Sequence, residues 1–86
     1  MSALVDEVRL SVSLPPPAIA RKIRVHARVS QERIAAELAV HPITVARWER
    51  GACTPRGDLR VRYARLLVVL DDVVTSAERA RMSGTS

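Results

Sequence analysis

Apolar residues in the middle of the chain recur at helical spacing in two short runs, over about residues 31–38 and 42–50. Within each run they stand one, three or four positions apart, so they share one face of a helix. The residues on these two faces are Ile34, Ala35 and Leu38, then Val45 and Trp48. Helices of about two to three turns are unstable alone, so we expect the two faces to bury each other across the connection at 39–41.

The residues at the ends of these runs are those that begin and end helices. Ser30 precedes the first run, where its side-chain oxygen can accept a hydrogen bond from a free backbone amide. Pro42 suits the first position of a helix, because the N–H that it lacks would have no partner there. Gly51 follows the second run and can adopt the left-handed conformation of a helix cap. The pattern therefore predicts two helices joined by a tight turn.

Two further helices are predicted on either side of this pair. The first runs over about 17–27, begins at a proline and presents Ala20, Ile23 and Ala27 inward. The last runs over about 57–79 and would be ~34 Å long at 1.5 Å per residue. Its apolar positions repeat at intervals of four and three residues, at Leu59, Tyr63, Leu66, Leu70, Val73 and Ala77.

This last helix is longer than the small domain beneath it, so the apolar positions of its far half need a partner. The N-terminal residues can supply one, and so can a second copy of the chain, which would make a two-fold dimer. A third arrangement is a kink at Asp71-Asp72 that folds the helix back onto its own domain. The sequence leaves these three arrangements open.

Residues 2–13 allow two interpretations. Leu4, Val8 and Val12 suit one face of a helix, which we favour. The alternation of apolar and polar residues from Val8 to Leu14 suits a half-buried strand. The three prolines that follow form a stiff break before the next helix.

Length and composition limit the architecture to one small domain. Eighty-six residues hold one modest core, and Trp48 and Tyr63 are the only aromatic residues, so the core is aliphatic and alanine-rich. We divide the chain into an N-terminal segment at 1–16, a helical domain at 17–70, and a helix extension with a frayed tail at 71–86. The predicted fold class is all-α, with four to five helices and an extended C-terminal helix.

Positive charge is concentrated in the middle of the chain. Between positions 21 and 65, eleven Arg and Lys residues face four Asp and Glu residues, a net +7, whereas the whole chain carries +5. Thirteen of the fourteen basic residues are Arg, whose guanidinium bonds phosphate and guanine bidentately. Genome composition also produces such a bias, so the position of the charge carries more weight. It favours a nucleic-acid partner.

Other functional classes find little support in the residues. Cys53 is the only cysteine and His26 and His41 the only histidines, so we expect no disulfide within the chain and no metal or other cofactor. The sequence contains no nucleophile and base in an evident arrangement and no Gly-rich phosphate loop, so we do not expect an enzyme. No apolar run approaches the roughly 20 residues that span a bilayer, and the N-terminus lacks the order of a signal peptide. We therefore expect a cytoplasmic protein without a membrane partner.

One set of residues appears in a familiar order and spacing. It comprises Ser30-Gln31, Ala35, Ala39-Val40-His41, Thr44-Val45-Ala46-Arg47-Trp48-Glu49-Arg50-Gly51 and Pro55. In this order it resembles the helix-turn-helix of the phage Cro and CI repressor family and its XRE-type bacterial relatives. The resemblance covers about residues 17–67. It implies a lambda-repressor-like domain that binds double-stranded DNA and places its second helix in the major groove.

Three residues depart from the family pattern. Ala39 replaces a turn glycine, and Arg28 stands where a glycine often ends the preceding helix. A left-handed backbone costs a non-glycine residue on the order of 1 kcal/mol, so we expect slightly altered turns at both sites. His41 in place of serine is expected to weaken the cap of the second helix.

The resemblance also implies which side chains contact DNA. Those nearest the base edges are Arg47, His41, Ile43 and Pro42. Those toward the DNA backbone are Gln31, Thr44, Arg50 and Arg56. Arg47 is the strongest candidate for direct readout, because its guanidinium can bond both acceptors of a guanine edge.

Two more residues match a structural pair of the family. Arg24 and Glu49 correspond to residues that form a partly buried salt bridge between the first helix and the recognition helix. The resemblance therefore implies that Glu49 holds the fold together and does not contact DNA. Trp48, at helical spacing from Val45, is expected in the core.

The sequence as a whole predicts a Cro-like or immunity-type repressor of a phage or mobile element, in the bacterial nucleoid or the cytoplasm of the phage's host. An excision or architectural accessory factor and an autoregulating antitoxin are the alternatives within DNA binding. A helical protein-interaction module is the alternative of another class, which the basic excess disfavours. The expected partners are double-stranded DNA and, through the C-terminal helix, a second copy of the chain. No small-molecule ligand is expected.

Overall fold

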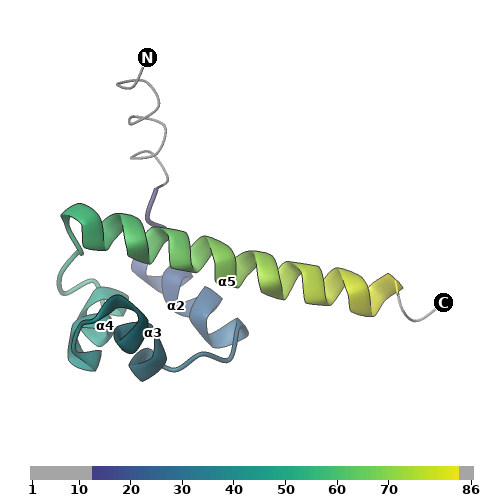
Figure 1. Cartoon of the computed structure of the whole chain (residues 1–86), viewed down its shortest axis with the longest axis horizontal. Coiled ribbons are helices and arrows are strands. Elements are labelled where there is room, and N and C mark those ends of the chain that lie inside the picture. Colours follow the sequence, from purple (N-terminus) through teal and green to yellow (C-terminus); the bar gives the residue numbers. More distant parts are fainter. Residues whose placement is uncertain (1–12, 84–86) are drawn as a thin grey trace, which may run out of the picture.

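The computed structural model describes residues 13–83, which form four α-helices and contain no strand. In chain order these are α2 (Pro17–His26), α3 (Gln31–Leu38), α4 (Pro42–Glu49) and α5 (Gly57–Ser83). The predicted all-α fold class is therefore confirmed for this part of the chain. Helices α2, α3 and α4 form a cluster, and α5 lies across it and extends well beyond it (Figure 1). The helix or strand predicted over 2–13 lies outside the described residues, except for Ser13.

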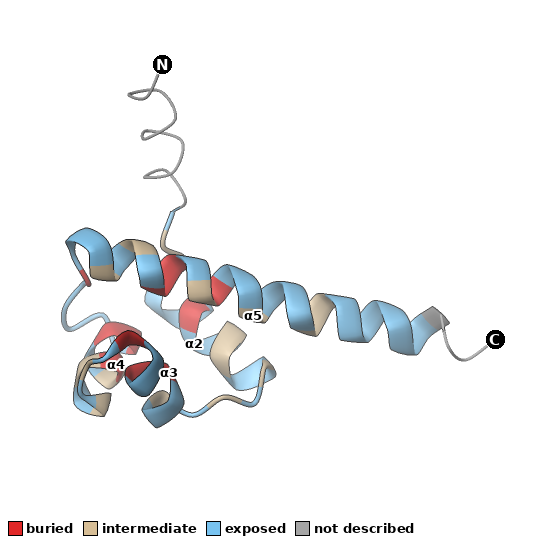
Figure 2. Ribbon diagram, in the orientation of Figure 1, coloured by how far each residue is buried: buried red, intermediate tan, exposed pale blue. Residues whose placement is uncertain are grey.

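The core lies where the first half of α5 crosses the other three helices (Figure 2). Its buried members are Ala20, Ile34, Ala35, Leu38, Val45, Trp48, Tyr63 and Leu67. The two apolar faces that the spacing predicted on α3 and α4 are thus both buried, and Trp48 is a core residue. The rings of Trp48 and Tyr63 join α4 to α5, with centroids 4.8 Å apart and planes tilted by 37°.

Helices α2, α3 and α4 end in the same way, with a left-handed residue followed by an amide that bonds five residues back. The left-handed residues are Arg28, Ala39 and Gly51, with φ of 58°, 57° and 74°. The bonds run from Val29 to Arg24 at 3.2 Å, from Val40 to Ala35 at 2.9 Å and from Ala52 to Arg47 at 2.9 Å. These are Schellman caps. The expectation of altered turns is wrong, because both non-glycine residues keep the left-handed conformation.

Side chains close the N-terminal ends of α3 and α4. Ser30 caps α3 as predicted, since its Oγ accepts a hydrogen bond from the amide of Arg33 at 3.1 Å. At α4, Nδ1 of His41 accepts from the amide of Ile43 at 3.1 Å. The expectation that His41 weakens this cap needs correction. Its Nδ1 stands as many bonds from the backbone as the side-chain oxygen of Asp or Asn, so it reaches the same amide.

Helix α5 is one continuous helix of 27 residues, about 40 Å long at 1.5 Å per residue. The kink considered at Asp71-Asp72 does not occur, and the helix continues past the end predicted near 79. No helix within residues 13–83 is long and apolar enough to cross a membrane. The first half of α5 completes the core, whereas its second half projects from the domain (Figure 2).

Candidate nucleic-acid interface

Helix α4 has one face in the core and one face in solvent. Val45, Trp48 and Glu49 are buried, whereas Arg47 is exposed and Ile43 is 48% exposed. Ile43 and Arg47 stand four residues apart, so they lie one above the other on the outer face. The inner face of α4 packs on α3 and α2, and Ile43 on the opposite face is left in water.

The structure places the four predicted base-contacting residues along α4, from its N-cap to its last turn. His41 and Ile43 are exposed, Pro42 is half-buried and Arg47 follows one turn later on the same side. The imidazole of His41 is used at its Nδ1 by the helix cap, which leaves the Nε2 side of the ring directed away from the capped amide. The exposed side of α4 therefore presents one imidazole, one apolar side chain and one guanidinium.

The residues predicted to contact the DNA backbone lie on α3, on α4 and beside the loop after α4, and they differ in exposure. Arg50 and Arg56 are exposed on either side of the loop after α4, whereas Thr44 and Gln31 are half-buried. The amide of Gln31 donates through Nε2 to Oε1 of Glu49 at 3.0 Å. One hydrogen of this amide is therefore engaged inside the protein, and Gln31 braces α4 against α3.

A network of charged and polar side chains holds the C-terminal end of α4. Arg24 on α2 donates through Nε to Oε2 of Glu49 at 2.5 Å and through Nη2 to Oε1 at 2.9 Å. Its Nη1 also donates to the carbonyl of Val29 at 2.9 Å. Together with Gln31, these bonds tie α4 to both α2 and α3. The salt bridge predicted from the sequence is present, and we call the set Arg24, Val29, Gln31 and Glu49 the bracing network.

The bracing network is removed from solvent. The side chain of Glu49 is 2% exposed and that of Arg24 is 13% exposed. The hydrogen bond to the Glu49 carboxylate raises the pKa of Arg24 above its ordinary value. The resemblance implied the Arg24–Glu49 pair. It did not imply the bond to the Val29 carbonyl, and no local pattern connects this turn with α2 and α4.

The exposed charge of α4 and its following loop is entirely positive. Arg47, Arg50 and Arg56 are exposed, and the only acidic residue of this segment is Glu49, which is buried in the bracing network. An acidic residue on the outer face would repel phosphate, but none is present there. The local field on this side of α4 therefore favours a polyanion.

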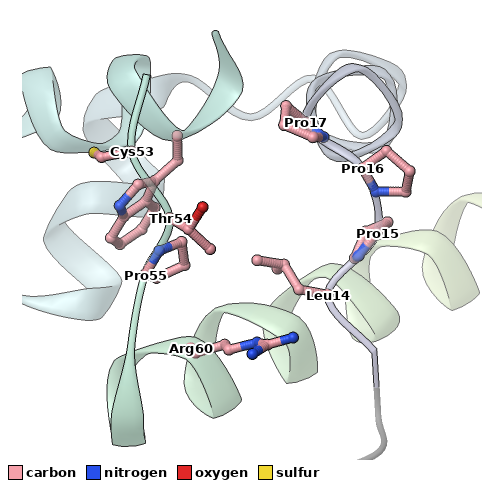
Figure 3. A pocket seen from close by; sticks show the side chains of 9 residues that line it. Leu14, Pro15, Pro16, Pro17, Cys53, Thr54, Pro55 and Arg60 are labelled. Carbon is pink, nitrogen blue, oxygen red and sulfur yellow. The ribbon is translucent and has the colours of Figure 1, made fainter. Parts of the chain in front are cut away.

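The loop after α4 lies opposite the prolines that precede α2 (Figure 3). A hollow of about 200 Å³ separates Thr54 and Pro55 from Pro15, Pro16 and Pro17. The side chains of Leu14 and Arg60 enter this space in Figure 3. Pro55 is itself buried. The hollow is lined by segments about 40 positions apart, so the local sequence pattern gives no signal of it.

Within the described part of the chain, no three His, Cys, Asp or Glu side chains gather as a metal site would require. Comparisons with family models, with characterised proteins and with solved structures find no match to this chain.

Proposed function

We propose that the protein binds double-stranded DNA in a sequence-specific manner, with α4 in the major groove, and that it regulates transcription. The observation that carries the proposal is the division of α4 into two faces. The inner face is fixed by the core and the bracing network, and the outer face offers Ile43 and Arg47 with no exposed acid beside them. A short helix of this kind fits the B-DNA major groove, which is about 12 Å wide.

The side chains on the outer face suit the edges of bases. The guanidinium of Arg47 can bond O6 and N7 of a guanine together, which is worth about 1–3 kcal/mol of discrimination. Ile43 has no donor, so its suitable partner is the methyl group of a thymine. His41 can donate through its remaining nitrogen to a base or a phosphate. Arg50 and Arg56, on either side of the adjacent loop, suit phosphates, which fix the register of a protein on the duplex.

The family resemblance supports the same conclusion from separate residues. The three-residue connection between α3 and α4 and the buried Arg24–Glu49 pair support a lambda-repressor-like domain of the Cro and CI type. Within that class we propose a small repressor of the Cro-like or immunity type, which occupies an operator and blocks promoter access. An accessory factor for excision or an autoregulating antitoxin would use the same surface.

The test is a selection of bound duplexes from a random pool, followed by fluorescence anisotropy on the selected sequence and on random DNA. Arg47→Ala should weaken the selected sequence by about 1–3 kcal/mol and relax preference at one base pair per site. Arg56→Ala should weaken all sequences alike and reduce the salt slope by about 1. Arg65→Ala removes an exposed charge from the outer side of α5 and serves as the matched control. Equal losses on selected and random DNA for both variants would contradict the role of Arg47.

One observation favours a second candidate function. Val68, Val69 and Val73 of α5 are between 48% and 61% exposed, and such apolar residues suit a protein partner. A salt titration separates the two functions. DNA binding should weaken linearly on a log-log plot as counterions are released, whereas docking of an apolar helix face should depend little on salt.

A further inference from the structure

The imidazole of His41 has a fixed orientation at the start of α4. Its Nδ1 accepts a hydrogen bond from the amide of Ile43 at 3.1 Å, and the backbone of His41 is extended, with φ of −74° and ψ of 143°. Pro42 favours this backbone, because a proline disfavours the helical conformation in the residue before it. Ring and backbone are therefore both restrained, although His41 is exposed.

The cap also decides which nitrogen of this imidazole carries the proton. A neutral imidazole has one N–H, and the nitrogen that accepts from a backbone amide does not bear it. Because Nδ1 is the acceptor, the proton lies on Nε2. The exposed edge of the ring is then a hydrogen-bond donor and not an acceptor. Serine, the residue of the family pattern here, leaves this choice open, because its hydroxyl rotates and both donates and accepts.

The Nε2–H donor has no acceptor within residues 13–83, where the bond to Ile43 is the one that the side chain of His41 makes. Its exposed neighbours on the outer face of α4 are the apolar side chain of Ile43 and the guanidinium of Arg47, and neither is an acceptor. A donor that is already restrained loses little conformational entropy on binding. The acceptor that suits it therefore belongs to a partner.

We propose that His41 determines specificity by donating from Nε2 to N7 of a purine in the major groove, an inference that rests on the proposed function. Guanine and adenine both present N7 as an acceptor. A pyrimidine has its C5 carbon at this place, which in thymine carries a methyl group. An imidazole held against the first turn of α4 does not extend as an arginine does. N7, beside the backbone of its own strand, suits its short reach better than the oxygens near the middle of the groove.

This donor reads a different feature of the duplex from Arg47. A guanidinium that bonds N7 and O6 together selects guanine, whereas a single donor to N7 accepts guanine and adenine alike and disfavours both pyrimidines. Besides the guanine contacted by Arg47, the selected sequence should therefore contain one position that is either purine. One neutral hydrogen bond gives a preference of about threefold to tenfold.

The first test is an NMR measurement of the full chain without DNA. Long-range correlations between the ring protons and nitrogens distinguish the two neutral tautomers, at about pH 8 where histidine side chains are neutral. His41 should carry its proton on Nε2 alone. His26, exposed in the last turn of α2, is the internal reference and should exchange between both tautomers. A proton on Nδ1 of His41, or the same mixture at both residues, would overturn the proposal.

The second test removes the acceptor from the selected duplex. A 7-deazapurine lacks N7 but keeps its base pairing, and at one purine position it should weaken binding about threefold to tenfold. The same change should have no effect on His41→Ala, whose affinity is lower on both duplexes. A methylphosphonate at the adjoining phosphate is the matched control and should weaken both proteins alike. A methylphosphonate effect that disappears in His41→Ala would assign His41 to a phosphate and refute the contact with N7.

The third test changes the direction of the hydrogen bond while keeping the cap. Asn and Asp cap helices about equally well, each through one side-chain oxygen. His41→Asn leaves an amide donor and should keep the preference for a purine. His41→Asp leaves a carboxylate oxygen, which is an acceptor, and should lose or reverse that preference. Urea unfolding checks that both variants are similarly stable, and an equal base preference in both would contradict the proposal.

The outcomes separate this inference from the proposed function. The NMR measurement needs no DNA, so it tests the tautomer of His41 by itself. A chain that binds a selected duplex but tolerates 7-deazapurines at every position except the guanine of Arg47 keeps the proposed function and refutes the contact with N7. A chain that binds no duplex refutes both.

Discussion

Removal of the Arg24 guanidinium tests whether the bracing network holds α4 in place. In Arg24→Ala the Glu49 carboxylate, 2% exposed, would keep only the bond from Gln31 at 3.0 Å. It would lose two charge-assisted bonds, at 2.5 and 2.9 Å. Loss of one partner from a buried ion pair costs about 3–5 kcal/mol, because the remaining charge is uncompensated. Since small domains are stable by only about 5–15 kcal/mol, a loss of this size would be a large fraction of the total.

Urea unfolding followed by Trp48 fluorescence measures this loss, because Trp48 is buried on the same helix as Glu49. The control is the double variant Arg24→Met with Glu49→Gln, which removes the charge and keeps an acceptor for Gln31. It should recover most of the stability, since a buried ion pair is often replaceable by neutral groups of similar size. DNA affinity of Arg24→Ala should fall as well, because α4 loses its tie to α2. A loss under about 1 kcal/mol for the single variant would refute the argument.

Three other changes follow from strained or unpaired groups. Ala39→Gly relieves a left-handed φ of 57° and should raise the unfolding free energy by about 1 kcal/mol. The control Ala36→Gly, inside α3, should lower the unfolding free energy by about as much. Urea midpoints that shift in the same direction for both variants would contradict this reasoning. The hydroxyl of Tyr63 is buried without a partner among the described residues, so Tyr63→Phe should stabilise the fold by on the order of 1 kcal/mol at pH 7. Burial raises the pKa of Tyr63 from 10.0 to about 12; the unfolded chain therefore loses this proton first, and stability should fall by about 2–3 kcal/mol between pH 10 and 12. A pH titration in which Tyr63→Phe shows the same fall would disprove that assignment.

Helix positions and buried faces followed from the sequence because they depend on neighbours a few residues apart. The bounds predicted for α3 agree with the structure, and those for α2 and α4 differ by one residue. The caps at Ser30 and Gly51 and the burial of Trp48 are likewise confirmed. Residue type alone gave wrong expectations for the cap at His41 and the turn at Ala39, where serine and glycine are the usual residues. Each nevertheless adopts the required geometry, since Nδ1 of His41 caps α4 and Ala39 has a φ of 57°.

The resemblance placed the Arg24–Glu49 pair, but spacing alone would not have found it, since its members stand 25 positions apart. Likewise, no local rule predicted the contribution of Gln31 or the hollow between the prolines and the loop after α4. Such contacts depend on how helices cross. A crossing angle reflects the sum of many side-chain contacts and not any one periodicity.

Local sequence determined where this chain is helical and which side of each short helix is apolar, because both are set by side-chain type at a spacing of three and four residues. The tertiary structure alone decided that α5 continues straight past Asp71-Asp72. The resemblance implied that Glu49 holds the fold together, and the packing of α2 and α3 against α4 places it in the bracing network while Arg47 lies in solvent. Residues two positions apart on a short helix face different surroundings, and only the packing of the other helices establishes which of them reaches water.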